Sequence, residues 1–197
     1  MRYLIFCLFL LSSQSGFAQS YADDIIAYRK QYVKELLDDA RSPIKPSQAK
    51  FLDFFQPNEK YSVIADFAAS PGSKPFLINT HSGKQRPYKE YGLLKFKISG
   101  QDLVLHIYQK VDFINDTAHK DDLFLPFNDK TNYETTFAGG RYIDLKISDI
   151  KDGKLLLDFN KCYNPYCAYA DGYSCPIPPK ENYLEIEIPV GEKMFQH

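Results

Sequence analysis

The sequence predicts a mainly β protein: a single antiparallel β-barrel or sandwich-like domain with one or two N-terminal α-helices. Two observations predict it. Apolar residues recur at three- and four-residue spacing only near the N-terminus, whereas after Pro57 they alternate with polar ones. The alternating runs are separated by short turns rich in Ser, Gly and Pro, without helical crossovers, which favours antiparallel pairing.

The first 18 residues have the pattern of a secretory signal peptide. Arg2 precedes an apolar stretch at residues 3–11, and Gly16-Phe17-Ala18 has the small-residue shape of a cleavage site. The apolar stretch is shorter than the roughly 20 residues that span a bilayer, and no later segment is apolar enough to do so. We therefore expect an exported, soluble protein, periplasmic or secreted. Residues 19–197 would form one domain with no transmembrane segment.

Charge and motifs exclude several functional classes. The 24 Lys and Arg residues nearly balance the 25 Asp and Glu residues without a basic block, which argues against nucleic acid or an anionic membrane as partner. The sequence has no nucleophile elbow, zinc-binding helix motif or phosphate-binding glycine loop, and its four histidines are scattered. We expect no metal and no cofactor. The remaining partners are an unknown small molecule or an envelope component.

Helix-type spacing marks the start of the mature chain. The apolar positions of this amphipathic pattern are Tyr21, Ile25, Tyr28, Tyr32, Val33, Leu36 and Leu37. They predict a helix packed on the core, which residues 38–46 end. A second, shorter helix is expected from Ser47 to before Pro57.

Strand-type alternation follows in seven runs. They lie at residues 61–67, 94–98, 103–107, 123–127, 141–147, 155–159 and 184–188. Turn signals such as Ser82-Gly83, Ser99-Gly100 and Asp152-Gly153 separate them. These runs predict half-buried strands of one sheet.

Arg141 has an unusual position in its predicted strand. It shares strand parity with Ile143 and Leu145, so its side chain is expected to point inward. A guanidinium stays charged when buried and needs a carboxylate or an anionic ligand as partner. Two interpretations stay open: an internal ion pair with Asp129 or Asp144, or a ligand site.

Residues 158–182 hold three cysteines and four prolines in a segment typical of neither helix nor strand. The spacing of Cys162, Cys167 and Cys175 does not fit the common zinc frameworks, and no histidine lies among them. In an exported protein a disulfide is favoured instead. Because proline lacks an amide donor, we expect the segment to be stapled against the edge or mouth of the sheet.

Motifs in two stretches resemble those of a bacterial and archaeal family, domain of unknown function 1684. They include Pro126-Phe127-Asn128, residues 136–145, and the ordered series D-F-N-x-x-Y-N-P, C-A-Y and C-P-x-P-P-x-E-N between Asp158 and Asn182. The resemblance spans residues 24–193. It implies a β-rich single domain, often exported, and no particular activity.

Three positions depart from the family pattern. Cys162 replaces a small residue, Tyr133 a glycine and Thr135 a glutamate, while Glu134 lies one place earlier and faces the other side of a strand. With Cys162 as the departure, the resemblance implies a disulfide between Cys167 and Cys175 and leaves Cys162 as a free thiol.

The leading functional hypothesis is a non-enzymatic small-ligand-binding or envelope-associated protein. Its polar site is expected near Arg141 and residues 158–182, with the candidate residues Arg141, Asp129, Asp144, Asn160, Asn164, Glu181 and Asn182. A first alternative is a hydrolase that uses two carboxylates from Asp129, Glu134, Asp144 and Glu181. A second alternative is a structural or assembly protein of the cell envelope.

Overall fold

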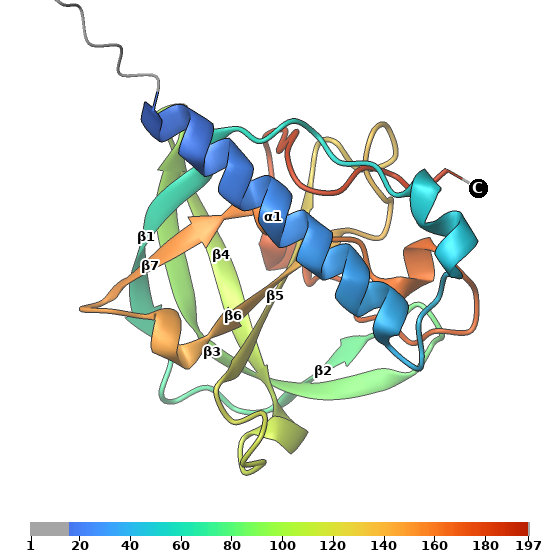
Figure 1. Cartoon of the computed structure of the whole chain (residues 1–197). Coiled ribbons are helices and arrows are strands. Elements are labelled where there is room, and N and C mark those ends of the chain that lie inside the picture. Colours follow the sequence, from blue (N-terminus) through green and yellow to red (C-terminus); the bar gives the residue numbers. More distant parts are fainter. Residues whose placement is uncertain (1–15, 197) are drawn as a thin grey trace, which may run out of the picture.

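The fold is one strongly curled sheet with a long helix lying across it (Figure 1). The structure is a computed structural model that describes residues 16–196, with side chains from residue 21 onward. The predicted signal peptide therefore lies outside the described residues, apart from residues 16–18 at the start of helix α1 (Gly16–Asp38). Within the described part of the chain, no helix combines the length and the apolarity needed to cross a membrane.

The sheet has eight strands, and the mainly β prediction is confirmed. They are β1 (Ser62–Ala69), β2 (Phe76–Asn79), β3 (Gln85–Ile98), β4 (Gln101–Lys110), β5 (Asp122–Asp129), β6 (Arg141–Lys146), β7 (Lys154–Asp158) and β8 (Tyr183–Leu184). Their order is β6-β5-β4-β3-β1-β7, with β2 paired to β3 and β8 to β5. All pairs are antiparallel except β5 with β8. The sheet curls into a half-barrel around the core.

The period-two pattern accounts for the core. In β3 and β4 the opposed Leu94 and Leu105 are both fully buried, and the alternate residues of β7, Leu155 and Leu157, face the same interior. Exposed Leu156 lies between these two, as strand geometry requires. Burial of these apolar side chains gives the main stabilisation of the sheet.

The predicted N-terminal helix is confirmed, and the predicted second helix is shorter than expected. Helix α1 buries Ile25 and Leu36, and Leu36 packs with Tyr169 and Phe195 from distant parts of the chain. The second helical segment is a short 3-10 helix, η1 (Pro46–Phe51), with proline at its start, where a missing amide costs nothing.

Three strand expectations differ from the structure. β3 (Gln85–Ile98) begins nine residues before the predicted run at 94–98. β2 was not predicted, because its residues Phe76, Leu77 and Ile78 are contiguous apolar residues without alternation. The run at 184–188 forms a strand only over Tyr183–Leu184. Beyond it, the backbone amide of Ile188 donates to a side chain, Asp129 Oδ1, at 3.2 Å, so the ladder does not continue.

Candidate functional site

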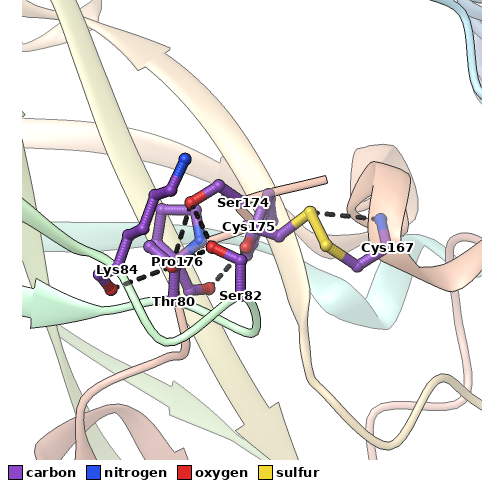
Figure 2. The surroundings of a disulfide bond; sticks show 8 residues. Thr80, Ser82, Lys84, Cys167, Ser174, Cys175 and Pro176 are labelled. Atoms are coloured by element: carbon purple, nitrogen blue, oxygen red, sulfur yellow. Dashed lines mark hydrogen bonds between the residues drawn. A yellow bond between two sulfur atoms is a disulfide. The ribbon is translucent and has the colours of Figure 1, made fainter. Parts of the chain in front are cut away.

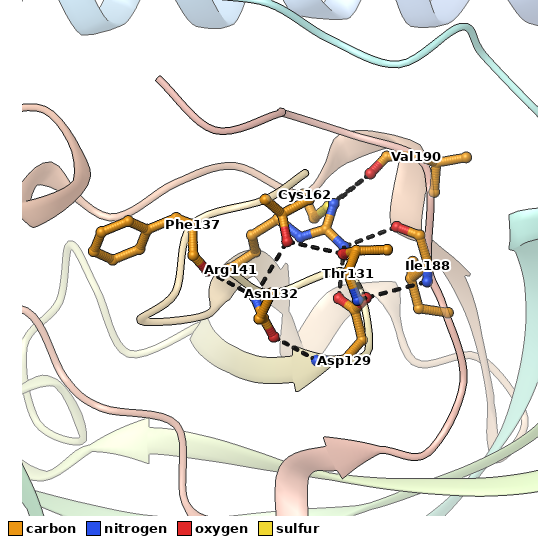
Figure 3. Close-up of polar contacts among 9 residues, drawn as sticks. Asp129, Thr131, Asn132, Phe137, Arg141, Cys162, Ile188 and Val190 are labelled. Carbon is orange, nitrogen blue, oxygen red and sulfur yellow. Dashed lines mark hydrogen bonds and ion pairs between the residues drawn. The ribbon is translucent and has the colours of Figure 1, made fainter. Parts of the chain in front are cut away.

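Arg141 lies at the start of β6 and is completely buried, as its strand parity predicts. Its Nη2 lies 2.6 Å from Asp129 Oδ2, and both side chains are excluded from solvent. The same nitrogen donates to the carbonyl of Ile188 at 2.8 Å, while Nη1 donates to the carbonyl of Val190 (Figure 3). Arg141 therefore joins β5 and β6 to the C-terminal segment.

The second oxygen of Asp129 completes this network. Asp129 Oδ1 accepts hydrogen bonds from the amide of Thr131 at 2.8 Å and from its hydroxyl at 2.6 Å. Gly140, just before Arg141, has φ of 87°, and a Cβ there would lie 2.2 Å from Asn128 Oδ1. The chain therefore enters β6 through a backbone conformation that only glycine adopts easily. Hydrogen bonds from Thr131 to Asp129, and from Arg141 to the carbonyls of Ile188 and Val190, fix the position of the buried ion pair.

Asn160 forms a second buried network, beneath the start of α1. Its Nδ2 donates to the Tyr21 hydroxyl at 2.8 Å and to the Asn58 carbonyl at 2.9 Å, and its Oδ1 accepts from the Asn58 amide at 2.7 Å. The Tyr21 hydroxyl in turn donates to Asp158 Oδ1 at 3.0 Å. Asn160 thus fastens α1 and the turn before β1 to the end of β7.

Asn182 fills a gap between β4 and β5, which pair directly only at Tyr108 and Phe124. Its Oδ1 accepts from the His106 amide at 2.7 Å, and its Nδ2 donates to the carbonyls of His106 and Pro126 at 2.8 and 2.7 Å. The side-chain amide replaces missing ladder hydrogen bonds. Its role in this structure is to close the sheet.

Glu192 is a buried carboxyl outside the set of predicted site residues. It accepts hydrogen bonds from the hydroxyls of Tyr169 at 2.7 Å and Tyr32 at 3.3 Å, and from the Asn164 amide at 2.9 Å. Because no Lys or Arg among the described residues pairs with it, burial raises the pKa of Glu192 to about 7. Gly191 before it has φ of 76°, and the glycine is a local sequence signal of a special backbone.

The disulfide expected in the 158–182 segment is confirmed, and it joins Cys167 to Cys175. Beside it, Ser174 Oγ lies 2.9 Å from both Thr80 Oγ1 and Ser82 Oγ at the turn between β2 and β3 (Figure 2). Cys162 is free, and burial raises the pKa of its thiol to about 11. A raised pKa keeps the thiol protonated and unreactive.

A cleft of about 680 Å³ lies between α1, β6 and the disulfide-bearing segment. Six of its lining residues are tyrosines: Tyr28, Tyr32, Tyr142, Tyr163, Tyr166 and Tyr173. Its charged residues are Glu35, Asp39, Arg41, Arg86 and Asp144. We call this the tyrosine cleft. Its size is within the range of roughly 300–1,000 Å³ typical of small-molecule sites.

Asp144 is the one predicted ligand-site residue that lines the tyrosine cleft. Its Oδ2 accepts a hydrogen bond from the Tyr163 hydroxyl at 2.8 Å. The crowded walls around it raise the pKa of Asp144 because they displace water from the carboxylate. The cleft is not predictable from local sequence patterns, because its walls come from five segments that are distant in the sequence.

The other carboxylates that were candidate hydrolase residues lie elsewhere. Asp129 is in the interior. Glu134 is exposed in the turn after β5, so the expectation that it lies on a strand is wrong. Glu181 lines a different hollow of about 380 Å³, together with Glu90 and Ser70. Among the described residues, no cluster of three or more His, Cys, Asp or Glu is arranged to hold a metal ion.

The fold and the cleft define a small half-barrel domain whose sheet, covering helix and disulfide-bearing segment enclose one tyrosine-lined site. The chain belongs to the family described as Protein of unknown function (DUF1684), whose model matches residues 48–193. A similar fold is the solution NMR structure of the uncharacterized protein from gene locus rrnAC0354 of Haloarcula marismortui. It is 29% identical, with a TM-score of 0.69 over 91% of this chain and 97% of that chain. A comparison of the chain with curated proteins found no match.

Proposed function

We propose that the protein is an exported, non-enzymatic small-ligand-binding protein of the periplasm or cell envelope, and that its ligand occupies the tyrosine cleft. The observation that carries this proposal is the cleft itself, with aromatic walls and a few polar groups in a volume of about 680 Å³. Export is supported by the signal-peptide pattern of residues 1–18 and by the disulfide.

Within this proposal, six of the seven predicted site residues have two roles, and the seventh, Glu181, lines the separate hollow with Glu90. Asp144 faces the ligand, whereas Arg141 with Asp129, Asn160, Asn164 and Asn182 hold the surrounding elements in place. Rigid walls favour binding because little conformational entropy is lost when the ligand enters.

Native mass spectrometry of the protein purified from its own host tests the proposal. The wild-type protein should carry a non-covalent small-molecule adduct. Gln31→Trp places a bulky ring in the cleft from the exposed face of α1 and should remove the adduct. Lys30→Trp is the matched control, because Lys30 is exposed on the same helix and does not line the cleft.

The two variants separate cleft binding from other binding. Loss of the adduct in Gln31→Trp and retention in Lys30→Trp supports the proposal. An adduct that persists equally in both variants places the ligand outside the tyrosine cleft. Wild-type protein without any adduct favours the structural or assembly role, in which the rigid segments serve contacts with other envelope components.

A hydrolase is the second candidate, and one observation favours it. Glu181 and Glu90 line the same hollow, where Glu90 Oε2 lies 2.7 Å from His106 Nδ1 and Glu181 Oε1 accepts from the Tyr108 hydroxyl at 3.2 Å. Two carboxylates in one hollow can act as acid and base. A panel of nitrophenyl esters, glycosides and phosphates tests this candidate. Turnover that Glu181→Gln abolishes and Glu185→Gln preserves would establish it, and no turnover by the wild type would eliminate it for these substrates.

A further inference from the structure

We infer that the ligand of the tyrosine cleft carries a carboxylate or phosphate group, which Arg86 binds, attached to a ring that the tyrosine side chains contact. This inference rests on the proposed function, because it names the chemical class of the ligand at that site. It follows from which polar groups of the cleft already have partners and which do not.

The tyrosine hydroxyls of the cleft are engaged within the protein. Tyr142 donates to the Pro176 carbonyl, Tyr163 to Asp144, Tyr166 to Asp39 and Tyr173 to the Arg41 carbonyl. Tyr32 donates to Glu192, and Tyr28 to the Lys161 carbonyl in a long contact of 3.5 Å. These tyrosines therefore offer a ligand mainly ring surface, which suits a flat apolar body.

The carboxylates of the cleft also have donors. Glu35 accepts from Gln31 Nε2 at 2.7 Å, Asp39 from the Tyr166 hydroxyl at 2.6 Å, and Asp144 from the Tyr163 hydroxyl at 2.8 Å. Arg41 has Asp39 beside it, with 3.8 Å between the nearest nitrogen and oxygen. The three carboxylates thus accept hydrogen bonds from the protein, and Arg41 has a counter-charge nearby but no hydrogen bond from its guanidinium to any described residue.

Arg86 is different. Its guanidinium makes no ion pair and no hydrogen bond with the described residues, although the side chain lines the cleft. The Arg86 side chain is exposed to solvent at the cleft, so its five N–H donors and its positive charge are available to a ligand. Arg41, the other cation of the cleft, differs in having a carboxylate, Asp39, nearby. A planar guanidinium binds carboxylate and phosphate oxygens through two parallel hydrogen bonds.

The backbone that carries Arg86 is fixed in place. Arg86 is in β3 opposite buried Ile78 of β2, and the turn between these strands is bound to the disulfide-bearing segment. The amide of His81 donates to the Cys175 carbonyl at 3.0 Å, and the amide of Ile177 to the Asn79 carbonyl at 2.8 Å. The β2–β3 hairpin thus places Arg86 beside the tyrosines of the cleft, and its hydrogen bonds to the disulfide-bearing segment fix its position.

Four probes with the same ring test the inference: benzoate, phenyl phosphate, benzyl alcohol and benzylamine. Their affinities for the full chain can be measured by NMR titration of backbone amide signals. We expect one or both anionic probes to bind more tightly than the alcohol, and benzylamine to bind most weakly. The preference between benzoate and phenyl phosphate distinguishes a carboxylate ligand from a phosphate ligand.

Arg86→Gln should weaken the preferred anionic probe by about tenfold or more, since a charge-assisted hydrogen bond is lost, and should leave benzyl alcohol unchanged. Arg41→Gln is the control on the same cleft and should have little effect. Equal binding of the anions by wild type and Arg86→Gln, tightest binding of benzylamine, or no binding of either anion would overturn the inference. The proposed function is judged separately, by the adduct that co-purifies with the wild-type protein.

Discussion

Two arginines on strands of the same sheet show opposite arrangements. Arg141 is buried at the start of β6, where it contacts Asp129 and two backbone carbonyls. Arg86, in β3, lines the tyrosine cleft and has no polar partner among the described residues. Arg141 is a predicted ligand-site residue, but its donors are largely used by hydrogen bonds within the fold. An arginine is therefore available for a ligand only where the protein leaves its donors free.

Breaking the buried pair should have the largest effect on stability. Arg141→Met leaves the Asp129 carboxylate buried without a counter-charge, so we expect the free energy of unfolding to fall by about 3–5 kcal/mol. Chemical denaturation with purified protein measures the loss. Lys154→Met is the control, because its ion pair with Asp66 is at the surface and should contribute less than about 1 kcal/mol. A loss in Arg141→Met no larger than in Lys154→Met would contradict the structural role of Arg141.

Glu192 contrasts with Arg141, because it is a buried carboxyl without a cationic partner among the described residues. Its pKa is about 7 in the folded protein against an ordinary value of 4.5, so the folded state retains a proton that the unfolded chain releases. Its contribution to stability therefore falls as pH rises from 4.5 to 7 and is constant above that range. At about 1.36 kcal/mol per pH unit, the decrease is about 3 kcal/mol.

Denaturation of wild type and Glu192→Gln at several pH values tests this linkage. The difference between their free energies of unfolding should shift by about 3 kcal/mol in favour of the variant between pH 4.5 and 7. Glu187→Gln, at an exposed position, should show no such shift. A constant difference over this range would mean that Glu192 has an ordinary pKa.

The disulfide supports the cleft rather than the interior. Replacing Cys167 and Cys175 by serine opens a loop with a sequence separation of 8, so we expect a loss of about 2–3 kcal/mol in the free energy of unfolding. The amides of His81 and Ile177, which donate to the carbonyls of residue 175 and Asn79, should exchange hydrogen faster, whereas Arg141 and its neighbours should keep their protection. Cys162→Ala is the single-cysteine control. Uniformly faster exchange across the protein would contradict a local role.

Substitution of Tyr133 should have the smallest effect on the free energy of unfolding, and it should stabilise the protein. It has φ of 71° and an exposed side chain, at the position where the family resemblance implies glycine. Tyr133→Gly should raise the free energy of unfolding by about 1 kcal/mol, because glycine adopts this conformation without strain. Tyr133→Ala retains the Cβ and should give little gain. Equal gains in both variants would show that the exposed ring, and not the backbone, is unfavourable.

Local patterns predicted the elements well. The three- and four-residue spacing located α1, the alternation located most strands, and strand parity placed Arg141 in the interior. The cleft was beyond such reasoning, because Arg86, Tyr32 and Tyr163 meet only after the sheet has curled and α1 has packed across it. The burial of Glu192 likewise depends on Tyr32, which is 160 residues away in sequence. Periodicity reports which face a residue occupies, not which distant segment covers it.

The contrast between the two arginines is tested most directly by NMR of their guanidinium groups. Spectra are recorded without a probe, with benzoate and with phenyl phosphate. We predict slow hydrogen exchange at the Nη groups of buried Arg141, unchanged by either probe, and fast exchange at Arg86 that slows when the preferred anion binds. If the signals of Arg141 respond to the anion and those of Arg86 do not, the assignment of the ligand group to Arg86 is wrong. The ligand then binds at Arg141.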